Sequence, residues 1–389
     1  MTYQELKDQE NQYVMHTYGR FSIALDHGKG AQLWDVEGKR YIDLTSGIGV
    51  CCLEIVNAIT EQAHKIMHVS TLFTTAPMVQ VAKTLVEQTG MGKVFFANSG
   101  AEANEGMIKL ARKYSYDKYG EGRAEIVTLR NSFHGRTVTT LKATGQDKFH
   151  QYFFPFTEGF AYAEANNMDS IRANVNEHTC AVMMELIQGE GGVMPLDQSF
   201  VQEVAAFCKE RDLLLLVDEV QTGIGRTGSL FCFQQYGIKP DVVSMAKGLG
   251  GGVPIGAVMA NTTCDDVLGP GTHATTFGGT PMCCASANAV LSEVTKPEFL
   301  KAVQEKGKYL EDKILAMGSD KVKGVRGLGL MVGIVVDAEE RAALVAEIMD
   351  KGVLVLTAGT NVIRLLPPLT ISYEEMDEAL AVMQSVFCK

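Results

Sequence analysis

Short apolar runs alternate with amphipathic stretches through the middle of the chain, from about residue 93 to residue 260. The apolar runs predict strands at residues 93–98, 125–129, 180–186, 213–219, 241–246 and 255–260. Stretches with helical spacing separate them, most clearly at residues 101–119 and 199–212. Strands that are apolar on both faces and alternate with helices predict a mostly parallel sheet covered by helices on both sides.

The pattern changes after about residue 285, where helical spacing at residues 286–294 and 298–317 comes first. The rest predicts one or two glycine-interrupted strands at 324–337, a helix at 338–352, strands at 353–358 and 362–368, and a helix at 372–387. Residues 29–47 have the pattern of a β-hairpin, which we expect to join this C-terminal unit. We therefore predict an α/β protein with a large domain at residues 50–285 and a smaller α+β domain formed by residues 1–49 and 286–389.

Composition narrows the classes of partner. The 389 residues are 46% hydrophobic and carry a net charge of −11 without a block rich in lysine or arginine. This balance argues against nucleic acid or an anionic membrane surface as a partner. The nine cysteines are odd in number and lack C-x-x-C spacing, so neither a disulfide framework nor a metal site is predicted. Since the N-terminal residues show no apolar signal core and no run of about 18 apolar residues occurs, we expect a cytoplasmic protein.

Small and polar residues follow the first predicted strand of the sheet. Residues 98–101, Asn-Ser-Gly-Ala, lead directly into a helical stretch. Backbone N–H groups at the start of a helix bind anions, and a hydroxyl and a glycine beside them favour such a site. The same residues are typical of an ordinary helix cap, with Asn98 or Ser99 as the capping residue. The pattern alone leaves both interpretations open.

A lysine and an aspartate stand at the ends of two further strands. Lys247 precedes Gly-Leu-Gly-Gly-Gly, whereas a nucleotide P-loop has its glycines before the lysine and Ser or Thr after it. Asp218 ends an apolar strand, where it is either a capped or ion-paired carboxylate or a partner for a cationic ring nitrogen. Because ligands bind beyond the carboxyl ends of parallel strands, we expect both side chains in one crevice.

Pyridoxal phosphate makes three demands that these residues meet together. Its aldehyde requires a lysine, its protonated pyridine nitrogen an acidic partner, and its phosphate an anion site. Lys247, Asp218 and residues 98–101 supply these groups, and the combination is far more specific than any one of them. Residues 223–228 (GIGRTG) match a dinucleotide fingerprint by letters, but no apolar helical run follows, so we interpret them as a loop rather than as an NAD site.

Residues 130–137, Arg-Asn-Ser-Phe-His-Gly-Arg-Thr, lie between two predicted strands. Phe133 could stack on a planar cofactor, and Arg136 could bind a substrate carboxylate through two hydrogen bonds. Taken alone, Phe133 is more simply explained as a residue packed in the core. His134 taken alone is more simply explained as a loop histidine whose hydrogen bonds are satisfied. The residues by themselves therefore do not decide these roles.

Seven ordered segments resemble the class III, ornithine-type aminotransferases. They are NSGAEANE (98–105), NSFHGRT (131–137), ELIQGEGGV (185–193), LLVDEVQTGIGRTG (215–228), MAKGLGGGVPIGA (245–257), HATTFGGTP (273–281) and IRLLPPL (363–369). The resemblance extends from about residue 13 to residue 388. It implies fold type I of the pyridoxal-phosphate transferases, with that cofactor, and a homodimer whose active site is shared between subunits.

The resemblance also implies roles for individual residues. Lys247 is the catalytic lysine that bonds the cofactor and moves the proton, and Asp218 pairs with the ring nitrogen. The further cofactor-binding residues are Ser99, Gly100 and Ala101 at the phosphate, Phe133 and Val220 on the ring faces, Gln221 near the ring hydroxyl, and Thr276 at the phosphate of the neighbouring subunit. The substrate-binding residues are Arg136 and Arg364, which would hold carboxylates, Glu190, which would neutralise Arg364 when the amine donor is bound, and Thr275.

Substrate choice depends on fewer residues. Ornithine aminotransferases have a tyrosine where this chain has Gly47, and in lacking it the chain is similar to enzymes that act on N-acetylornithine. We therefore expect transfer of the δ-amino group of N-acetylornithine to 2-oxoglutarate, as in arginine biosynthesis. Ornithine, succinylornithine, 4-aminobutyrate and a lysine-pathway amine are the alternative donors, and an aminomutase of the same family is the alternative reaction.

Three positions depart from the family's pattern. The chain runs directly from Leu53 to Glu54, where members of the family have a longer loop. Cys51 replaces a frequent asparagine, and Leu186 replaces a frequent proline. The junction at Leu53–Glu54 is either a true deletion or an altered loop, and the sequence alone does not decide between them. A shortened loop near the mouth of the active site is the feature that favours a non-catalytic relative, whereas the intact Lys247 and Asp218 argue against that hypothesis.

Overall fold

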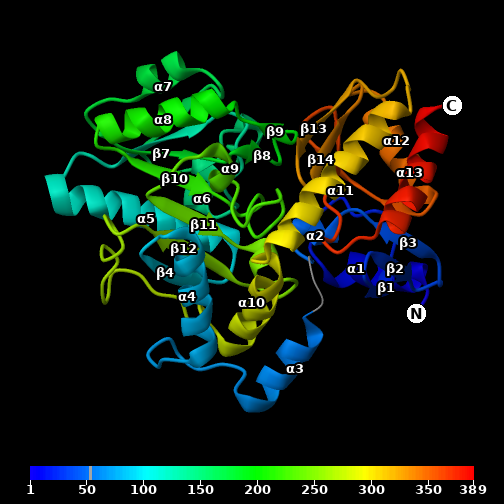
Figure 1. The fold of residues 1–389 in the computed structure, drawn as a ribbon, viewed down its shortest axis with the longest axis horizontal. Helices are drawn as coiled ribbons and strands as arrows, with labels where there is room; N and C mark the ends of the chain where they lie inside the picture. Colours follow the sequence, from blue (N-terminus) through cyan, green and yellow to red (C-terminus); the bar gives the residue numbers. More distant parts are fainter. Residues whose placement is uncertain (52–54) are drawn as a thin grey trace.

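The computed structural model describes residues 1–51 and 55–389, and a seven-stranded sheet forms its centre (Figure 1). The strand order is β4-β12-β11-β10-β7-β5-β6. The strands are β4 (Lys93–Ala97), β5 (Glu125–Leu129), β6 (Phe160–Ala163), β7 (Thr179–Met184), β10 (Leu214–Asp218), β11 (Val242–Met245) and β12 (Gly256–Ala260). Within this sheet β12 runs antiparallel to both of its neighbours, and the remaining pairs are parallel. The mostly parallel sheet predicted from the apolar runs is therefore confirmed.

The structure adds one strand to the six that the pattern predicts for the central sheet. This strand, β6, lies at the edge of the sheet and has only four residues, three of which are half-buried. An edge strand need not be apolar on both faces, and so short a run is ambiguous when read alone. Residues 223–228 lie in the turns between β10 and α9 (Phe233–Tyr236), as expected of a loop.

Alternate residues along the strands pack into two separate cores, one on each face of the sheet. Ile126 of β5 belongs to the core that contains the inward face of α5 (Gly100–Tyr119). Its neighbour Val127 belongs to the core that contains α8 (Gln198–Glu210) and α10 (Pro281–Val294). Because successive side chains of a strand point to opposite faces, this division explains why apolar residues occupy both faces of the strands.

Two four-stranded sheets and one two-stranded sheet complete the strand inventory of the described residues. The first pairs the predicted hairpin, β2 (Gln32–Asp35) and β3 (Arg40–Asp43), with β1 (Leu25–Lys29) and with β15 (Val353–Leu354). The second has the order β13 (Gly324–Leu328), β14 (Met331–Val335), β17 (Val362–Leu365) and β16 (Leu356–Ala358). The small sheet pairs β8 (Ile187–Gln188) with β9 (Met194–Pro195).

The prediction of one strand at residues 353–358 is wrong, because the chain changes sheets within it. The first half, β15, pairs with β3, whereas the second half, β16, pairs with β17. Val355 lies between the two halves and is fully buried. The run is apolar because each half packs on the core, and an apolar pattern carries no information on a change of pairing partner.

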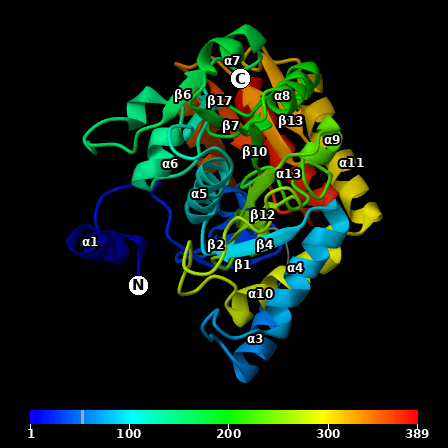
Figure 2. The ribbon, with the colours of Figure 1, turned by 90° about the vertical axis from the view of Figure 1, so that its left-hand side faces the viewer.

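The remaining helices cover the sheets and the outer surface of the molecule (Figure 1). They are α1 (Tyr3–Tyr13), α2 (Ser46–Gly49), α3 (Val56–Lys65), α4 (Ala76–Thr89), α6 (Val138–Ala143), α7 (Met168–Asn174), α11 (Pro297–Ala316), α12 (Arg341–Asp350) and α13 (Tyr373–Phe387), with 3-10 turns η1 (Asp147–Phe149) and η2 (Lys247–Leu249). Helix α1 buries no side chain and lies at the edge of the molecule (Figure 2).

Helices α11 to α13 lie with β1–β3 on one side of the molecule, beside the seven-stranded sheet (Figure 1). We propose the two-part division expected from the sequence, residues 50–285 against residues 1–49 plus 286–389. The junction at Leu53–Glu54 lies outside the described residues. Across residues 1–51 and 55–389, no helix is both long and apolar enough to cross a membrane.

Candidate active site

A cavity of about 610 Å³ opens at the carboxyl ends of the parallel strands, where a ligand site is expected in this kind of sheet. Its wall comes from the loops after β4, β5, β10 and β11. The lining residues are Tyr18, Val50, Asn98, Ser99, Gly100, Ala101, Asn104, Phe133, His134, Gly135, Arg136, Glu185, Asp218, Val220, Gln221, Ala246, Lys247, Gly252, Val253, Pro254 and Ile255. Most residues that the sequence singles out therefore share one cavity.

The loop after β4 both caps a helix and lines the cavity, so its two interpretations are compatible. Ser99 is the N-cap of α5, and its Oγ accepts a hydrogen bond of 3.2 Å from the backbone N–H of Glu102. The helix therefore directs its positive end at the cavity. At Gly100 a β-carbon would lie 2.6 Å from a methyl group of Val220, so the close approach of these two loops requires glycine.

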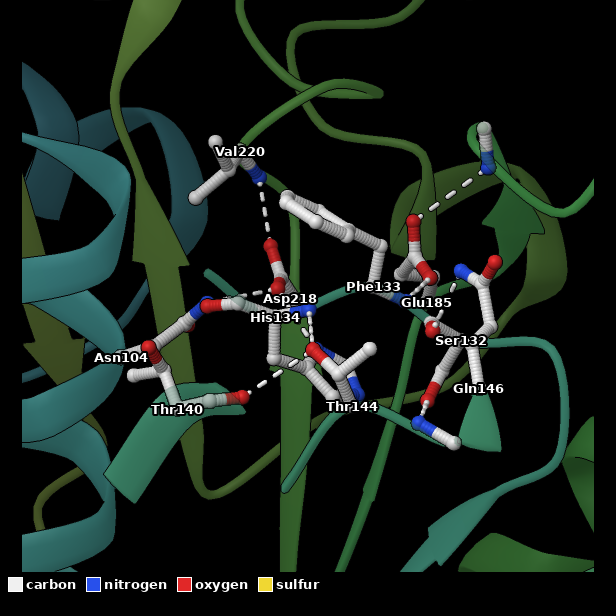
Figure 3. Close-up of polar contacts among 12 residues, drawn as sticks. Asn104, Ser132, Phe133, His134, Thr140, Thr144, Gln146, Glu185, Asp218 and Val220 are labelled. Carbon is white, nitrogen blue, oxygen red and sulfur yellow. Dashed lines mark hydrogen bonds and ion pairs between the residues drawn. The ribbon is translucent and has the colours of Figure 1, made fainter. Parts of the chain in front are cut away.

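The Asp218 carboxylate is buried and has three hydrogen-bond partners (Figure 3). Its Oδ2 accepts from Asn104 Nδ2 at 2.7 Å and lies 2.8 Å from His134 Nδ1, and its Oδ1 accepts from the Val220 N–H at 3.0 Å. These partners offset the cost of placing a carboxylate at the end of an apolar strand. His134 is buried in this network, and its backbone N–H donates to Thr144 Oγ1 at 2.9 Å.

Lys247 follows β11 at the start of η2 and lies partly buried in the cavity wall. Its backbone has φ of 44°, in the left-handed region that non-glycine residues seldom adopt. Burial, followed by the nearby charge of Arg364, lowers the pKa of the Lys247 ammonium, and the carboxylates of Glu190 and Asp218 oppose this shift. The arrangement therefore favours a neutral, nucleophilic amine.

Glu185 is a second buried carboxylate in the cavity wall, and it joins two loops. Its Oε2 accepts from the Phe133 N–H at 2.8 Å, and its Oε1 accepts from the Gly189 N–H at 3.3 Å. Burial raises the pKa of Glu185 to about 7; the charge of His134 opposes this increase and the charge of Asp218 adds to it. Glu185 thus holds the backbone of Phe133 in place at the cavity wall.

Arg364 is almost fully buried, 2% exposed, and is held by two oxygen atoms. Its Nη1 donates to Glu190 Oε1 at 2.7 Å and to Gln221 Oε1 at 3.1 Å. Gln221 lines the cavity, whereas Arg364 and Glu190 lie behind it. The Nε of Arg364 is buried without a hydrogen-bond partner among the described residues, so this guanidinium retains a donor for a further group.

Arg136 lies on the cavity rim and is exposed. Its guanidinium carbon lies 4.1 Å from the ring centre of Phe149 and 5.5 Å from that of Phe133. In the part of the chain that the structure describes, no carboxylate forms an ion pair with it. A cation held only by aromatic rings remains available to an anionic ligand.

Thr275 and Thr276 lie in a different cavity, of about 500 Å³, together with Glu105 and Lys109 of α5. The Oγ1 of Thr275 accepts from the Gly278 N–H at 2.8 Å. A single chain therefore does not bring these threonines to Lys247, and their expected roles at a neighbouring subunit's phosphate and at the substrate remain predictions.

The family profile described as aminotransferase class III matches residues 13–387, nearly the whole chain. The chain belongs to the class III aminotransferases. Two similar curated relatives are acetylornithine aminotransferases, from Haemophilus ducreyi (47% identical, 99% of each chain covered) and Caldanaerobacter subterraneus (47% identical, 97% of this chain and 98% of the relative). As a class III enzyme it is a pyridoxal-phosphate-dependent aminotransferase.

Solved structures of this fold agree over the full length of the class III chain. An ornithine aminotransferase from Toxoplasma gondii matches with a TM-score of 0.94 at 29% identity, covering 99% of this chain and 94% of that one. An N-acetylornithine aminotransferase from Stenotrophomonas maltophilia matches with a TM-score of 0.84 at 34% identity, covering 98% of each chain. The expected fold, type I of the pyridoxal-phosphate transferases, is thereby confirmed.

The residues of the class III site fit the three reactive parts of pyridoxal phosphate. Gly100 has no side chain to cover the start of α5, so a phosphate can approach the backbone there. Asp218 lines the cavity, and hydrogen bonds hold both of its carboxylate oxygens in place. Lys247 supplies an amine of lowered pKa for the aldehyde. When bound, this cofactor withdraws electrons from the carbon that loses its proton during amino transfer.

Sequence reasoning missed two polar residues of this class III site. Asn104 lies on the buried face of α5, four residues after Gly100, and donates to both Asp218 and the carbonyl oxygen of His134. Glu185 comes directly after β7, and in the sequence it is notable only as the first residue of the segment ELIQGEGGV. A polar residue on an otherwise apolar helix face, and an acid at a strand end, are signals that could have identified them.

Proposed function

We propose that this protein transfers the δ-amino group of N-acetylornithine to 2-oxoglutarate, giving glutamate and an N-acetylated semialdehyde, the transamination of arginine biosynthesis. The observation that carries the proposal is the contrast between two arginines, one neutralised by a carboxylate and one without an ion pair among the described residues. Relatives at 43–47% identity named acetylornithine aminotransferase support the choice of donor.

The two substrates differ in what they present beside the reacting carbon. 2-Oxoglutarate has a carboxylate there, whereas the δ-carbon of N-acetylornithine has none. Arg364 binds this carboxylate, and Glu190 takes its place on the guanidinium when the donor is bound. A buried guanidinium without an anionic partner is costly, so a movable glutamate allows one site to accept both substrates.

Both substrates also have a carboxylate at their far end, and Arg136 is the cation proposed to bind it. It lies at the rim of the same cavity and has no competing ion pair among residues 1–51 and 55–389. Gly47 supports an acetylated donor, because ornithine aminotransferases have a tyrosine at this position and this chain lacks it.

Within this site, Lys247 would hold the cofactor through its aldehyde group, and its amine would accept and return the proton of the reacting carbon. Asp218 would face the ring nitrogen and favour its protonated form, and Asn104 and His134 hold this carboxylate in position. Phe133 and Val220 would pack against the ring and exclude water, and Gln221 would hydrogen-bond its hydroxyl group. Ser99, Gly100 and Ala101 would hold the phosphate at the start of α5.

A cytoplasmic homodimer with a shared active site is part of the same proposal. The support for sharing is the position of Thr275 and Thr276 in a cavity apart from Lys247. The support for the compartment is the chemistry of the cysteines, because the eight described ones are all free thiols, as is typical of a reducing environment.

A panel of amine donors tests the proposed reaction. With 2-oxoglutarate as acceptor, kcat/KM for N-acetylornithine should exceed the values for ornithine and 4-aminobutyrate by at least about tenfold, the size expected when one polar group is wrongly matched. A higher value for either competitor would reassign the donor. Net turnover without any oxo-acid acceptor would replace the transaminase by an aminomutase.

A further inference from the structure

Arg136 is held in place by aromatic rings, which is an unusual support for a substrate-binding cation. The Phe149 ring centre lies 4.1 Å from its guanidinium carbon, closer than the Phe133 ring centre at 5.5 Å. The two rings also touch each other edge to face, with centres 6.0 Å apart and planes at 76°. Phe149 is therefore the principal contact of the guanidinium, and it links Arg136 to the residue proposed to stack on the cofactor.

The backbone around Phe149 is anchored on the loop that contains Arg136. Gln146 Nε2 donates to the Ser132 carbonyl oxygen at 3.0 Å, and the Gly145 N–H donates to Ser132 Oγ at 3.0 Å (Figure 3). The Phe149 N–H then donates to the Gln146 carbonyl oxygen at 3.0 Å, which closes η1. These bonds fix the position of the Phe149 ring relative to residues 132–136.

An aromatic partner has a different consequence from a carboxylate partner. A ring face attracts the guanidinium and restricts its orientation, yet it leaves the five N–H donors and the positive charge free. A carboxylate would occupy the same donors that an incoming substrate needs. The arrangement therefore orders an exposed arginine before the substrate arrives, and ordering in advance increases affinity.

We propose that Phe149 is a positioning residue for Arg136: by packing on the guanidinium, it orders this cation to bind the far carboxylate of both substrates. The proposal rests on the proposed function, because that function gives Arg136 its ligand. Phe149 has no part in the amino transfer itself, so its loss should weaken binding of the carboxylate and leave the chemical step intact.

The decisive variant is Phe149→Leu in the cofactor-loaded enzyme. We expect KM for N-acetylornithine and for 2-oxoglutarate to rise roughly 3- to 10-fold, the range for a cation–π contact at a partly exposed site, with kcat within about twofold of wild type. Phe149→Tyr keeps the ring face and should restore KM. A fall in kcat at unchanged KM would overturn the proposal.

A donor without the carboxylate isolates the effect. N-Acetylputrescine is N-acetylornithine without its carboxylate, so its kcat/KM should be the same for wild type and Phe149→Leu, within about twofold. An equal loss for both donors would show that Phe149 acts on the cofactor or the fold. Phe153→Leu is the matched control, because this exposed ring lies in the same segment and contacts Tyr152 rather than Arg136.

Binding measured by calorimetry gives a readout that does not depend on turnover. Glutarate has both carboxylates of 2-oxoglutarate but no reacting carbonyl group, so its Kd should rise about 3- to 10-fold in Phe149→Leu. In Phe149→Leu combined with Arg136→Gln, Kd should be no weaker than in Arg136→Gln alone. Additive losses in the double variant, or glutarate binding that is insensitive to Arg136→Gln, would contradict the proposal.

The two proposals fail in different experiments. If wild type does not transaminate N-acetylornithine but glutarate binding follows the expected pattern, the donor is wrong and the role of Phe149 stands. If N-acetylornithine is the donor and glutarate binding ignores Phe149, the proposed function stands and the positioning role fails.

Discussion

The two arginines proposed to bind substrate have identical side chains but lie in opposite surroundings. Arg364 lies on β17, 2% exposed, with its Nη1 engaged by Glu190 and Gln221. Arg136 lies in a loop on the rim, exposed to solvent, and its contacts are the rings of Phe133 and Phe149. In the proposed function, one cation stays neutralised until a substrate carboxylate displaces its partner, and the other is available to each substrate.

Burial explains the difference. A guanidinium removed from water requires an anionic or strongly polar partner, because the desolvation cost of an isolated charge is several kcal/mol. An exposed guanidinium remains hydrated and needs only orientation, which a ring supplies at about 1 kcal/mol. The buried arginine can therefore discriminate between substrates, while the exposed one can only anchor them.

The largest expected effect is on turnover, and it separates the chemical step from the binding of substrate by the two arginines. Lys247→Ala removes the amine that bonds the cofactor and carries the proton, so turnover should fall roughly 10³-fold or more. Both arginines remain, so the Kd of glutarate should change by less than about threefold. Single-turnover kinetics and calorimetry measure the two quantities. Normal transamination by this variant would disprove the role of Lys247.

Glu190→Gln should make the buried arginine behave like the exposed one. Arg364 then keeps its positive charge unneutralised while the donor is bound, which should lower kcat/KM in the donor half-reaction by roughly 10- to 100-fold. The acceptor half-reaction should be retained or improved, because 2-oxoglutarate no longer competes with a carboxylate. Rapid mixing of each substrate alone measures the two halves. Equal losses in both halves would mean that Glu190 does not discriminate.

The buried side of the site should also respond to pH through Glu185. Its pKa is raised from the ordinary 4.5 to about 7, chiefly by burial, so the folded protein binds a proton that the unfolded chain has lost. The stabilisation from the neutral carboxyl group is complete below pH 4.5 and is lost as pH rises through 7. His134 and Asp218 are the charged groups that modulate this pKa.

Glu185→Gln should remove this dependence. Relative to wild type, the unfolding free energy of the variant should increase between pH 4.5 and pH 7, by up to about 3 kcal/mol, and remain level above pH 7.5. Urea unfolding followed by circular dichroism at several pH values gives the difference. The exposed Glu339→Gln is the control and should show no such trend. A difference that is flat from pH 4.5 to pH 8 would contradict the raised pKa.

The same contrast between buried and exposed regions separates what could be predicted from the sequence from what could not. Burial on both faces makes β5, β7, β10 and β11 mostly apolar, so the sheet and the strand ends that bear Asp218 and Lys247 are visible in the pattern. The division of residues 353–358 between two sheets is not visible in the pattern, because the residues from Val353 to Leu356 form one apolar run across the break.

Contacts between distant segments account for the rest of the site. Asn104 reaches Asp218, and Glu185 reaches the backbone of Phe133, through hydrogen bonds that join different elements. Phe149 stacks on Arg136 because Gln146 is bonded to Ser132, which no periodicity along the chain records. Residue type and spacing indicate which side chains could take part in catalysis or binding, and the fold determines which of them are held in position.

The smallest expected effect concerns Arg136, the exposed arginine. Arg136→Lys keeps the positive charge but loses the planar group that packs on Phe149 and pairs with both oxygens of a carboxylate. KM for N-acetylornithine should rise roughly 3- to 5-fold with kcat unchanged, and Phe149→Leu should add little in the Arg136→Lys background. Steady-state kinetics at constant ionic strength measures both. If Arg136→Lys equals wild type while Phe149→Leu is impaired, the ring acts on Phe133 and the cofactor instead of on the arginine.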